Sequence, residues 1–294
     1  MNLEDLRVFK EVAKHANMTK AAESLNFVQS NVTAKMKRLE QKYETKLFYR
    51  HKQGVELTSP GKMLLSYAVQ TLQLMDDAEK SLKESHAPSG TLSIGSMETT
   101  TATRLPRILS GYHDHYPAVE LSLQTGTTKE LIKAALKREI DGAFVAGEVR
   151  HPNLVKIEAF EEELMLIAKK NSLSNAEFDQ LDKQLFIVFK SGCFYRDTLE
   201  KWLESKGIIP TRMMELNTLD GIMGCVQAGL GVSLLPKTAT DQLNQSKTIT
   251  RFPLPEPYGK VQTWFIHHKD IVQTSAFCKF KEIFYDEGIV EVEG

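Results

Sequence analysis

The sequence of 294 residues lacks the features of secreted and membrane proteins. No apolar run approaches the roughly 18 residues that a membrane-spanning helix needs, and the first residues lack the basic start and apolar core of a signal peptide. The three cysteines, Cys193, Cys225 and Cys278, are far apart. An odd number of widely spaced cysteines is typical of reduced thiols rather than of a disulfide framework. The sequence therefore predicts a cytoplasmic protein that does not bind membranes.

Signatures of catalysis and of metal binding are also missing. The sequence contains no Gly-Lys-Ser phosphate loop, no nucleophile elbow and no ligand set with metal-binding spacing. His113 and His115 would lie on different faces of a helix, and the adjacent His267 and His268 would point to opposite sides of a strand. We therefore expect no enzymatic activity, no metal and no cofactor.

The net charge of −1 hides an uneven distribution of charge. The first 60 residues carry 11 lysines and arginines against 7 aspartates and glutamates, a balance of +4, whereas the remainder is acidic. A basic end on an otherwise acidic chain is typical of a small nucleic-acid-binding module attached to a domain of another kind.

The first 40 residues show the periodicity of three short helices. Leu3, Leu6 and Phe9 begin the apolar stripe of the first helix, and Thr19 is predicted to be the N-cap of the second. The second helix carries the small pair Ala21–Ala22, which permits a close helix crossing. The third helix, from about residue 28 to 42, is predicted to bury Val32, Met36 and Leu39. Residues 47–58 then predict two short strands around a glycine-containing turn, which would form a basic wing.

The outward side chains of the third helix and the wing are of the types that read base edges or bind phosphates. The alternative, a solvated helix face, is the commoner role of exposed charges. We predict DNA contacts from Thr19, Gln29, Ser30, Asn31, Thr33, Lys35, Lys37, Arg38, Arg50 and Lys52.

A long helix is predicted from Ser59 to about His86, with Pro60 in its first turn, where proline is tolerated. Its apolar seam has the four–three spacing of a coiled coil and comprises Leu64, Ala68, Thr71, Met75, Ala78 and Leu82. Because one helix cannot bury such a seam alone, we expect it to pair with a second copy of itself. Residues 87–90 would end the helix and form a linker.

The remainder alternates predicted strands and helices. Residues 92–95, 119–124 and 141–145 predict strands in one half, and residues 185–189 and 231–235 predict strands in the other. This alternation indicates two α/β subdomains with a mostly parallel sheet. Ligands of such sheets bind beyond the carboxyl ends of the strands, which predicts a cleft there.

The chain resembles the LysR-type transcriptional regulators along essentially its whole length. The residues that carry the resemblance are Phe9, Ala13, Thr19-Lys20-Ala21-Ala22, Leu25, Gln29–Thr33, Leu39-Glu40, Leu47-Phe48, Arg50, Leu57-Thr58, Gly61, Leu92–Gly95 and Gly229–Pro236. The chain departs from the usual family pattern at Ser30, Asn31, Ala34 and Lys35, although Gln29, Thr33 and Arg38 match it, so the resemblance does not fix the base preference at the departing positions.

The resemblance implies an α/β fold with three parts. These are an N-terminal winged helix-turn-helix (1–58), a dimerising linker helix and hinge (59–90), and a periplasmic-binding-protein-like α/β effector domain (91–294). The effector domain would comprise subdomain I (about 91–161 and 267–294) and subdomain II (about 162–266). The implied function is transcription regulation by a dimer or tetramer on double-stranded promoter DNA.

Three segments follow predicted strands and open helices with many hydroxyl and N–H donors. By family position they would face the cleft, and we predict effector contacts from Ser96, Met97, Thr99, Thr127, Gly192, Cys193, Tyr195 and Arg196. Arg196 would clamp a carboxylate or phosphate, which favours a small anion as effector. Helix capping is the alternative role of the hydroxyls. A regulator that is ligand-independent or that responds to oxidation at Cys193 remains the alternative function.

Overall fold

The computed structural model describes residues 2–51, 53–83, 88–172, 181–243 and 248–286. The chain divides into two compact units, of which the first comprises Met1–Lys83 and Lys137–Glu139 and the second Glu84–Leu136 and Ile140–Gly294. Each unit has a hydrophobic core of its own. None of the helices in the described part of the chain is both long and apolar enough to cross a membrane.

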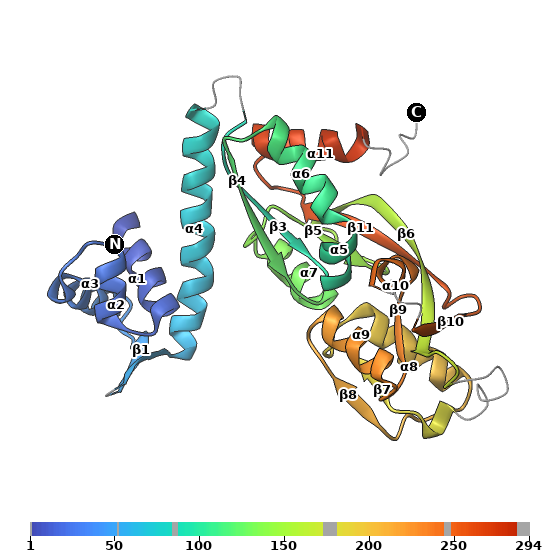
Figure 1. The fold of residues 1–294 in the computed structure, drawn as a ribbon. Coiled ribbons are helices and arrows are strands. Elements are labelled where there is room, and N and C mark those ends of the chain that lie inside the picture. Colours follow the sequence, from blue (N-terminus) through green and yellow to red (C-terminus); the bar gives the residue numbers. More distant parts are fainter. Residues whose placement is uncertain (1, 52, 84–87, 173–180, 244–247, 287–294) are drawn as a thin grey trace. The chain divides into compact units, whose positions relative to one another are not determined.

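The N-terminal unit confirms the predicted three helices, wing and long helix. Its elements are α1 (Leu3–His15), α2 (Met18–Ser24), α3 (Gln29–Lys42), β1 (Phe48–His51), β2 (Gly54–Leu57) and α4 (Ser59–Lys83) (Figure 1). Val32, Met36 and Leu39 of α3 are fully buried among α1 and α2, as their spacing predicts. The antiparallel pair β1–β2 forms the wing.

The start of α2 corrects the predicted cap. The N-cap is Asn17, whose Oδ1 accepts the backbone N–H groups of Thr19 at 2.9 Å and Lys20 at 3.1 Å. Asparagine is at least as good an N-cap as threonine, so the helix begins at Met18 and Thr19 lies inside its first turn. The side chain of Thr19 is exposed.

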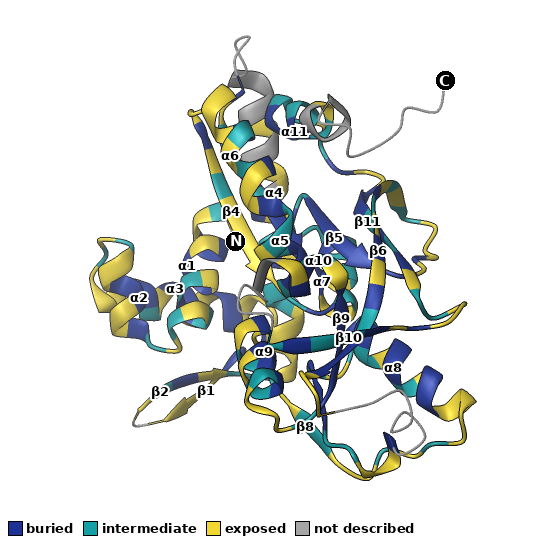
Figure 2. Ribbon diagram, turned by 45° about the vertical axis from the view of Figure 1, so that its right-hand side comes forward, coloured by how far each residue is buried: buried dark blue, intermediate teal, exposed yellow. Residues whose placement is uncertain are grey.

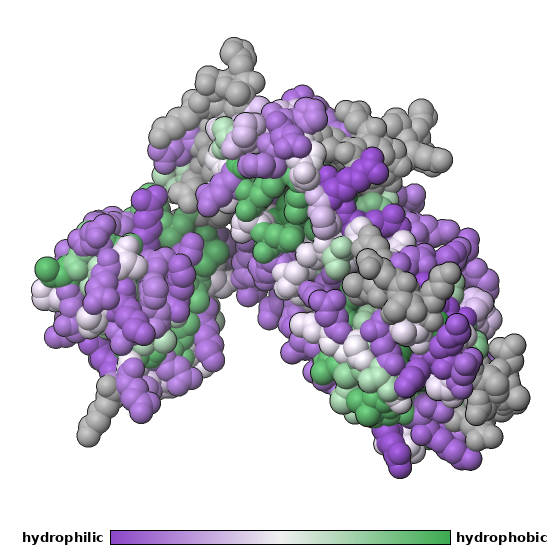
Figure 3. All heavy atoms as spheres, in the orientation of Figure 1, coloured by the Kyte–Doolittle hydropathy of each residue, from purple (hydrophilic) through white to green (hydrophobic). Residues whose placement is uncertain are grey.

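The apolar residues of α4 are divided between two uses. Ala68 and Leu72 are buried in the N-terminal core, and Leu64 packs against it, so two residues of the predicted seam are covered within the unit itself. Other large apolar side chains of α4 are exposed, namely Met63, Tyr67, Leu74 and Met75. Figure 3 shows apolar surface along α4 beside the largely hydrophilic surface of α1 to α3. The side chain of Leu82, the predicted end of the long helix at residues 84–86 and residue 87 of the predicted linker lie outside the described part.

The second unit is an α/β structure. Its elements are β3 (Gly90–Ser96), α5 (Glu98–Thr103), α6 (Leu105–His115), β4 (Val119–Thr125), α7 (Thr128–Leu136), β5 (Gly142–Ala146), β6 (Leu154–Lys169), β7 (Phe186–Val188), α8 (Phe194–Ser205), β8 (Met213–Glu215), α9 (Leu219–Ala228), β9 (Ser233–Pro236), α10 (Lys237–Leu243), β10 (Ile249–Pro253), β11 (Lys260–His268) and α11 (Ser275–Asp286). A seven-stranded sheet has the order β10-β6-β11-β5-β3-β4, with β9 also paired to β6, and β7 and β8 form a separate parallel pair.

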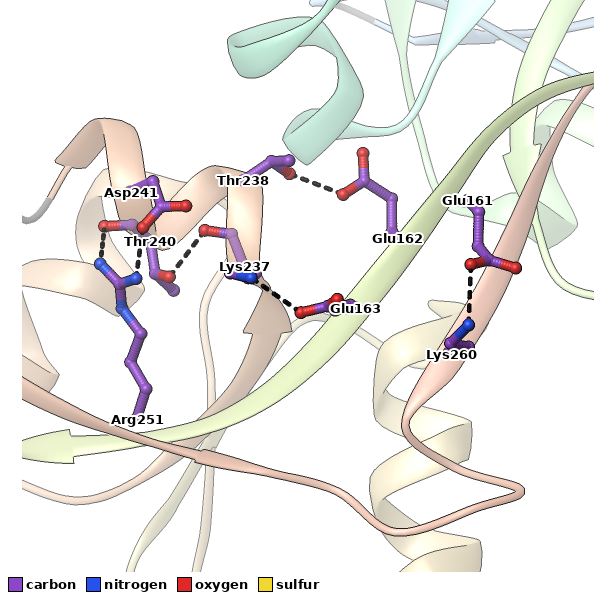
Figure 4. Close-up of polar contacts among 9 residues, drawn as sticks. All are labelled: Glu161, Glu162, Glu163, Lys237, Thr238, Thr240, Asp241, Arg251 and Lys260. Carbon is purple, nitrogen blue, oxygen red and sulfur yellow. Dashed lines mark hydrogen bonds and ion pairs between the residues drawn. The ribbon is translucent and has the colours of Figure 1, made fainter. Parts of the chain in front are cut away.

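The prediction of a mostly parallel sheet was wrong. Strand β3 is parallel to β4 and β5, but β6 and β11 are antiparallel to their neighbours. The sixteen-residue β6 carries three consecutive glutamates, Glu161 to Glu163, which interrupt the apolar alternation of a strand. Glu161 and Glu163 are exposed and pair with Lys260 of β11 and Lys237 of α10, whereas the side chain of Glu162 is buried and accepts a hydrogen bond from Thr238 (Figure 4). The predicted subdomain boundaries fall within β6 and β11.

Helices cover both faces of the sheet, as the α/β prediction requires. Along β5, Phe144 joins one core with α6 and α11, whereas Ala143 and Val145 face the core that includes α7. This second core continues through β7, β9 and α8, and Figure 2 shows the alternation of buried and exposed residues along α8. The sheet and its helices thereby fix the loops that follow β3, β4 and β7.

Candidate functional site

The third helix presents a continuous exposed face to solvent, and its side chains are mostly polar. Ser30, Ala34, Lys37 and Gln41 follow one another at spacings of four, three and four residues, and all are exposed. The predicted DNA contacts Gln29, Asn31 and Arg38 are also exposed and flank this stripe, and Thr33 is half-buried within it. The helix begins without a side-chain cap at Val28, which leaves its first N–H groups available to an anion. DNA contact by these residues stays a prediction.

Lys35 does not belong to this face. Its side chain is buried, and its Nζ lies 3.0 Å from Glu4 Oε2 and 3.5 Å from Asp5 Oδ1 in the first turn of α1. The prediction that Lys35 contacts DNA is therefore wrong. The helical spacing indicates that Lys35 lies on the buried face of α3, because it is three residues after buried Val32 and four before buried Leu39.

The wing is attached firmly to the helical part of the unit. The N–H of Val55 donates to the carbonyl of Ala16 at 2.8 Å, and a Cβ at Gly54 would lie 2.3 Å from that same oxygen. Arg50 is 40 % exposed, so its guanidinium remains accessible at the surface. Lys52, the other predicted contact from the wing, lies outside the described residues.

A cavity of about 210 Å³ lies in the second unit where several strands end. Four segments form it, after the parallel strands β3, β4, β7 and β8, and these are the strand ends at which α/β sheets bind ligands. The lining residues are Met97, Glu98, Thr99, Thr125, Gly126, Thr127, Thr128, Phe189, Lys190, Cys193, Tyr195 and Asn217. Five of the eight residues predicted to bind an effector are brought together there, and their role in binding stays a prediction.

Two buried hydroxyls meet in this cavity. Thr99 Oγ1 and the Tyr195 phenol oxygen are 3.2 Å apart and share a hydrogen bond. One hydroxyl donates to the other, which leaves the accepting hydroxyl with a proton for a ligand. Burial raises the pKa of Tyr195 well above its usual range, so the phenol is a neutral donor and acceptor at physiological pH.

A capping box and an ion pair lie along the same wall. Glu130 Oε2 accepts the N–H of Thr127 at 2.9 Å and its hydroxyl at 3.0 Å, while Thr127 Oγ1 caps the N–H of Glu130. Glu130 Oε1 lies 2.8 Å from Lys190 Nζ, and this hydrogen bond lowers the pKa of Glu130. Lys190 was missed at the sequence level, although it stands directly after a predicted strand and before the turn at residues 191–193.

The guanidinium of Arg196 contacts two carboxylates. Its Nε lies 2.8 Å from Glu200, its Nη1 lies 2.8 Å from Glu215, and Nη1 also donates to the Phe189 carbonyl at 3.4 Å. These contacts hold the guanidinium beside Glu200 and Glu215 and not in the cavity lining, and the predicted anion clamp stays a prediction.

Ser96 and Gly192 also lie outside the cavity lining. Ser96 is fully buried and donates to the Met97 carbonyl at 3.1 Å. Gly192 has a φ of +91° that favours glycine, and its carbonyl accepts the N–H of Lys129 at 3.4 Å. Both residues therefore shape the loops around the cavity, and their contact with an effector stays a prediction.

The chemistry of Cys193 favours a structural role over a redox role. Burial raises the pKa of the Cys193 thiol to about 11, so the reactive thiolate is scarce at physiological pH. Among the described residues, no group of three or more histidines, cysteines, aspartates or glutamates could hold a metal ion. His267 and His268 are both buried in β11.

Two family models match the two units of the chain. The model described as "Bacterial regulatory helix-turn-helix protein, lysR family" matches residues 3–62, and that of the "LysR substrate binding domain" matches residues 85–288. The second match covers the cavity and the first covers α3 and the wing.

Known proteins agree with both matches. The chain is 41% identical over 280 residues to the HTH-type transcriptional regulator GltR of Bacillus subtilis (strain 168), covering 95% of each chain. It is 44% identical over 280 residues to the uncharacterized HTH-type transcriptional regulator YusT of the same strain, covering 95% of this chain and 94% of YusT. The structure of full-length CbnR complexed with its target DNA has the same fold, with a TM-score of 0.70, 23% identity and coverage of 97% of this chain and 99% of CbnR. The chain belongs to the LysR family and is a LysR-type DNA-binding transcriptional regulator.

Proposed function

We propose that this regulator binds promoter DNA through the exposed face of α3 and the wing. The observation that carries the proposal is the continuous stripe from Ser30 to Gln41, flanked by Arg38 and accompanied by Arg50 on the wing. Polar side chains at the start of α3 suit base edges, whereas Lys37, Arg38 and Arg50 suit phosphates. CbnR, which shares this fold, is described in complex with its target DNA.

The test is enrichment of genomic fragments on the immobilised full-length chain, followed by sequencing. The wild type is expected to enrich discrete fragments, and Lys37→Ala is expected to recover less DNA of every sequence. Lys201→Ala is the matched control, because Lys201 is an exposed lysine of α8 in the other unit. Uniform recovery of all fragments by the wild type, or equal loss in both variants, would contradict the assignment.

We further propose that a small molecule with an anionic group occupies the cavity and modulates DNA binding. Of the described residues in the lining, Lys190 supplies the positive charge, and it pairs with Glu130 on the surface. An ion pair with both side chains about half exposed contributes little stability, so a ligand anion could replace Glu130 at low cost. Met97, Phe189 and Tyr195 offer apolar surface for the rest of the ligand.

A thermal-shift screen of the full-length chain against carboxylates, amino acids and phosphorylated metabolites tests this proposal. A ligand at a hundredfold over its Kd stabilises by about 2.7 kcal/mol, which is an easily measured shift in Tm. Lys190→Gln should weaken an anionic hit, while Lys201→Gln should not. A saturable hit that is unaffected by Lys190→Gln and by Thr99→Val would place the effector elsewhere.

We also propose that two copies pair through the exposed apolar residues of α4, Met63, Tyr67, Leu74 and Met75. Dimers and tetramers are what the family resemblance implies. Leu74→Ser should shift the sedimentation of the chain toward monomer, whereas Leu230→Ser, an exposed leucine of the second unit, should not. An unchanged assembly in Leu74→Ser would contradict this interface.

Two further inferences accompany the proposal. We infer a non-enzymatic role, since GltR and YusT are named as regulators, and we place the protein in the cytoplasm, where promoter DNA is. A ligand-independent or redox-responsive regulator is the alternative, and the raised pKa of Cys193 argues against the redox form.

A further inference from the structure

One buried carboxylate connects α3 to the wing. Glu40 lies near the end of α3, and its Oε1 accepts the N–H of Leu47 at 3.0 Å and that of Phe48 at 3.4 Å. Its Oε2 lies 3.5 Å from Arg50 Nη2 and 4.0 Å from Lys46 Nζ. The side chain is only 7 % exposed, so a single charged group holds the first strand of the wing against α3.

The attachment of the wing does not depend on Glu40 alone. Thr58 Oγ1 donates to the Lys46 carbonyl at 2.6 Å, and the N–H of Thr58 donates to the Leu47 carbonyl at 3.0 Å. Leu47 and Phe48 are themselves buried in the core. Backbone hydrogen bonds and apolar packing thus also hold these residues, while the second carboxylate oxygen of Glu40 faces the guanidinium of Arg50 at 3.5 Å.

One part of the Arg50 side chain is paired within the unit, and another part is exposed to solvent. One terminal nitrogen faces the buried carboxylate of Glu40, while 40 % of the side chain is exposed. A guanidinium can hold a carboxylate through one edge and still donate to a phosphate through another, because it carries five N–H donors in a rigid plane. The contact with Glu40 therefore orients the guanidinium of Arg50 and leaves other N–H donors for a phosphate.

We propose that Glu40 is a positioning residue for DNA binding, which acts through Arg50 and does not itself touch DNA. It fixes the guanidinium relative to the exposed stripe of α3, so that the helix and the wing engage the backbone together. The inference rests on the proposed DNA-binding face.

The test compares Glu40→Gln, Arg50→Ala and the double variant in the full-length chain. Glutamine keeps an amide oxygen for the N–H groups of Leu47 and Phe48 but removes the charge that pairs with Arg50. The probe is a labelled DNA duplex of arbitrary sequence, titrated over a range of NaCl concentrations, because phosphate contacts are independent of sequence. Each single variant should bind roughly threefold to tenfold more weakly, with a salt slope reduced by about one. The double variant should be no worse than Arg50→Ala alone.

Three results would overturn the proposal. A lower Tm of Glu40→Gln with wild-type affinity and salt slope would leave Glu40 a purely structural role. Tighter binding by Glu40→Gln would show simple repulsion of DNA by the carboxylate, and additive losses in the double variant would show action independent of Arg50. If Glu40→Gln does not fold, Arg50→Lys replaces it as the test variant. Lysine keeps the positive charge but loses the planar set of N–H donors. Wild-type DNA affinity and salt slope in Arg50→Lys would also overturn the proposal. Failure of the DNA-binding face itself is separate, because it would appear as wild-type binding by Lys37→Ala.

Discussion

The two units of this regulator build their candidate sites in opposite ways. The N-terminal unit places most of its proposed DNA contacts along one helix, where a spacing of three and four residues brings them onto one face. The second unit assembles its cavity from four segments that are separated by as many as 120 positions, from Met97 to Asn217. A site on one helix can be read from periodicity, whereas a site between loops depends on which strands are neighbours.

Both units also use a cation for structure where the sequence suggested binding. Lys35 joins α3 to Glu4 and Asp5 of α1, and Arg196 joins α8 to Glu215 of β8. The side chain of Lys35 is 8 % exposed and that of Arg196 is 20 % exposed, so both differ from the freely exposed lysines nearby. The comparison teaches that burial, rather than charge, separates cations that hold the fold from cations that meet a ligand.

The largest effect is expected from the buried ion pair of the second unit. Arg104 contacts Glu162 through Nε at 3.0 Å and Nη2 at 2.9 Å, and it stacks over Phe160. Thr238 of α10 donates to the other oxygen of Glu162 at 2.8 Å (Figure 4). Arg104→Met would leave a buried carboxylate without its cation, which should destabilise this unit by about 3 kcal/mol, the low end for buried pairs because Arg104 is partly exposed.

Denaturant unfolding that separates the two units measures this loss. The double variant Arg104→Met/Glu162→Gln should recover part of the stability, because the buried charge is gone. An unchanged midpoint in Arg104→Met would show that the pair is dispensable and would weaken the comparison between structural and binding cations.

A somewhat smaller loss is expected at Lys35. Lys35→Met should destabilise the N-terminal unit by about 2 kcal/mol, because the buried carboxylate of Asp5 loses its contact with Lys35 Nζ while the half-exposed Glu4 can turn to water. Lys37→Met, two residues away and exposed, should change stability by less than about 0.5 kcal/mol and lower DNA affinity instead. Equal effects of the two changes on thermal unfolding would break the distinction between them.

A loss of about 1 kcal/mol is expected at the hydroxyl pair in the cavity. Tyr195→Phe removes one partner of the Thr99 hydrogen bond and leaves the buried Thr99 hydroxyl to find another. Thermal unfolding of the full-length chain measures the effect on the second unit. A Tm for Tyr195→Phe equal to the wild-type value would mean that the hydrogen bond contributes nothing, and the hydroxyls would then be free for a ligand.

The last effect on stability concerns Cys193, and it is absent at neutral pH and appears only in alkaline solution. The burial that raises its pKa to about 11 stabilises the neutral thiol, and this contribution is complete below its ordinary value of 9.0. It is lost as the pH rises from 9.0 toward 11, because the unfolded chain then releases the thiol proton more easily than the folded chain. At neutral pH, iodoacetamide should modify the partly exposed Cys225 and Cys278 before Cys193. Fastest labelling of Cys193 would revive the redox alternative.

The sequence predicted most of the N-terminal unit because its helices obey a single period. Phe9, Val12, Val32 and Met36 are fully buried as their spacing requires. The two errors there are local. The N-cap of α2 is Asn17 and not the nearby Thr19, and Lys35 lies on the buried face of α3 although the other predicted contacts from this helix lie on its exposed face. A count of helical positions would have corrected the second error.

The second unit was less predictable because its decisive contacts are distant in sequence. The partner of Arg196 across the fold, Glu215, is 19 positions away, and the pair Lys190–Glu130 spans 60 positions. Neither could be identified before the strands were placed. Strand β6 was not predicted because the three charged residues Glu161 to Glu163 interrupt the apolar alternation that identifies a strand. The middle of β6 is stabilised by ion pairs instead.

The central claim is that occupation of the cavity changes the binding of DNA by the other unit. The direct measurement is the affinity of the full-length chain for an enriched genomic fragment, without and with a saturating ligand from the thermal-shift screen. Coupling between the sites predicts a change of about 5- to 150-fold, matched by an equal change in ligand affinity when DNA is bound. A ligand that saturates the cavity and leaves the fragment's affinity unchanged would contradict the claim.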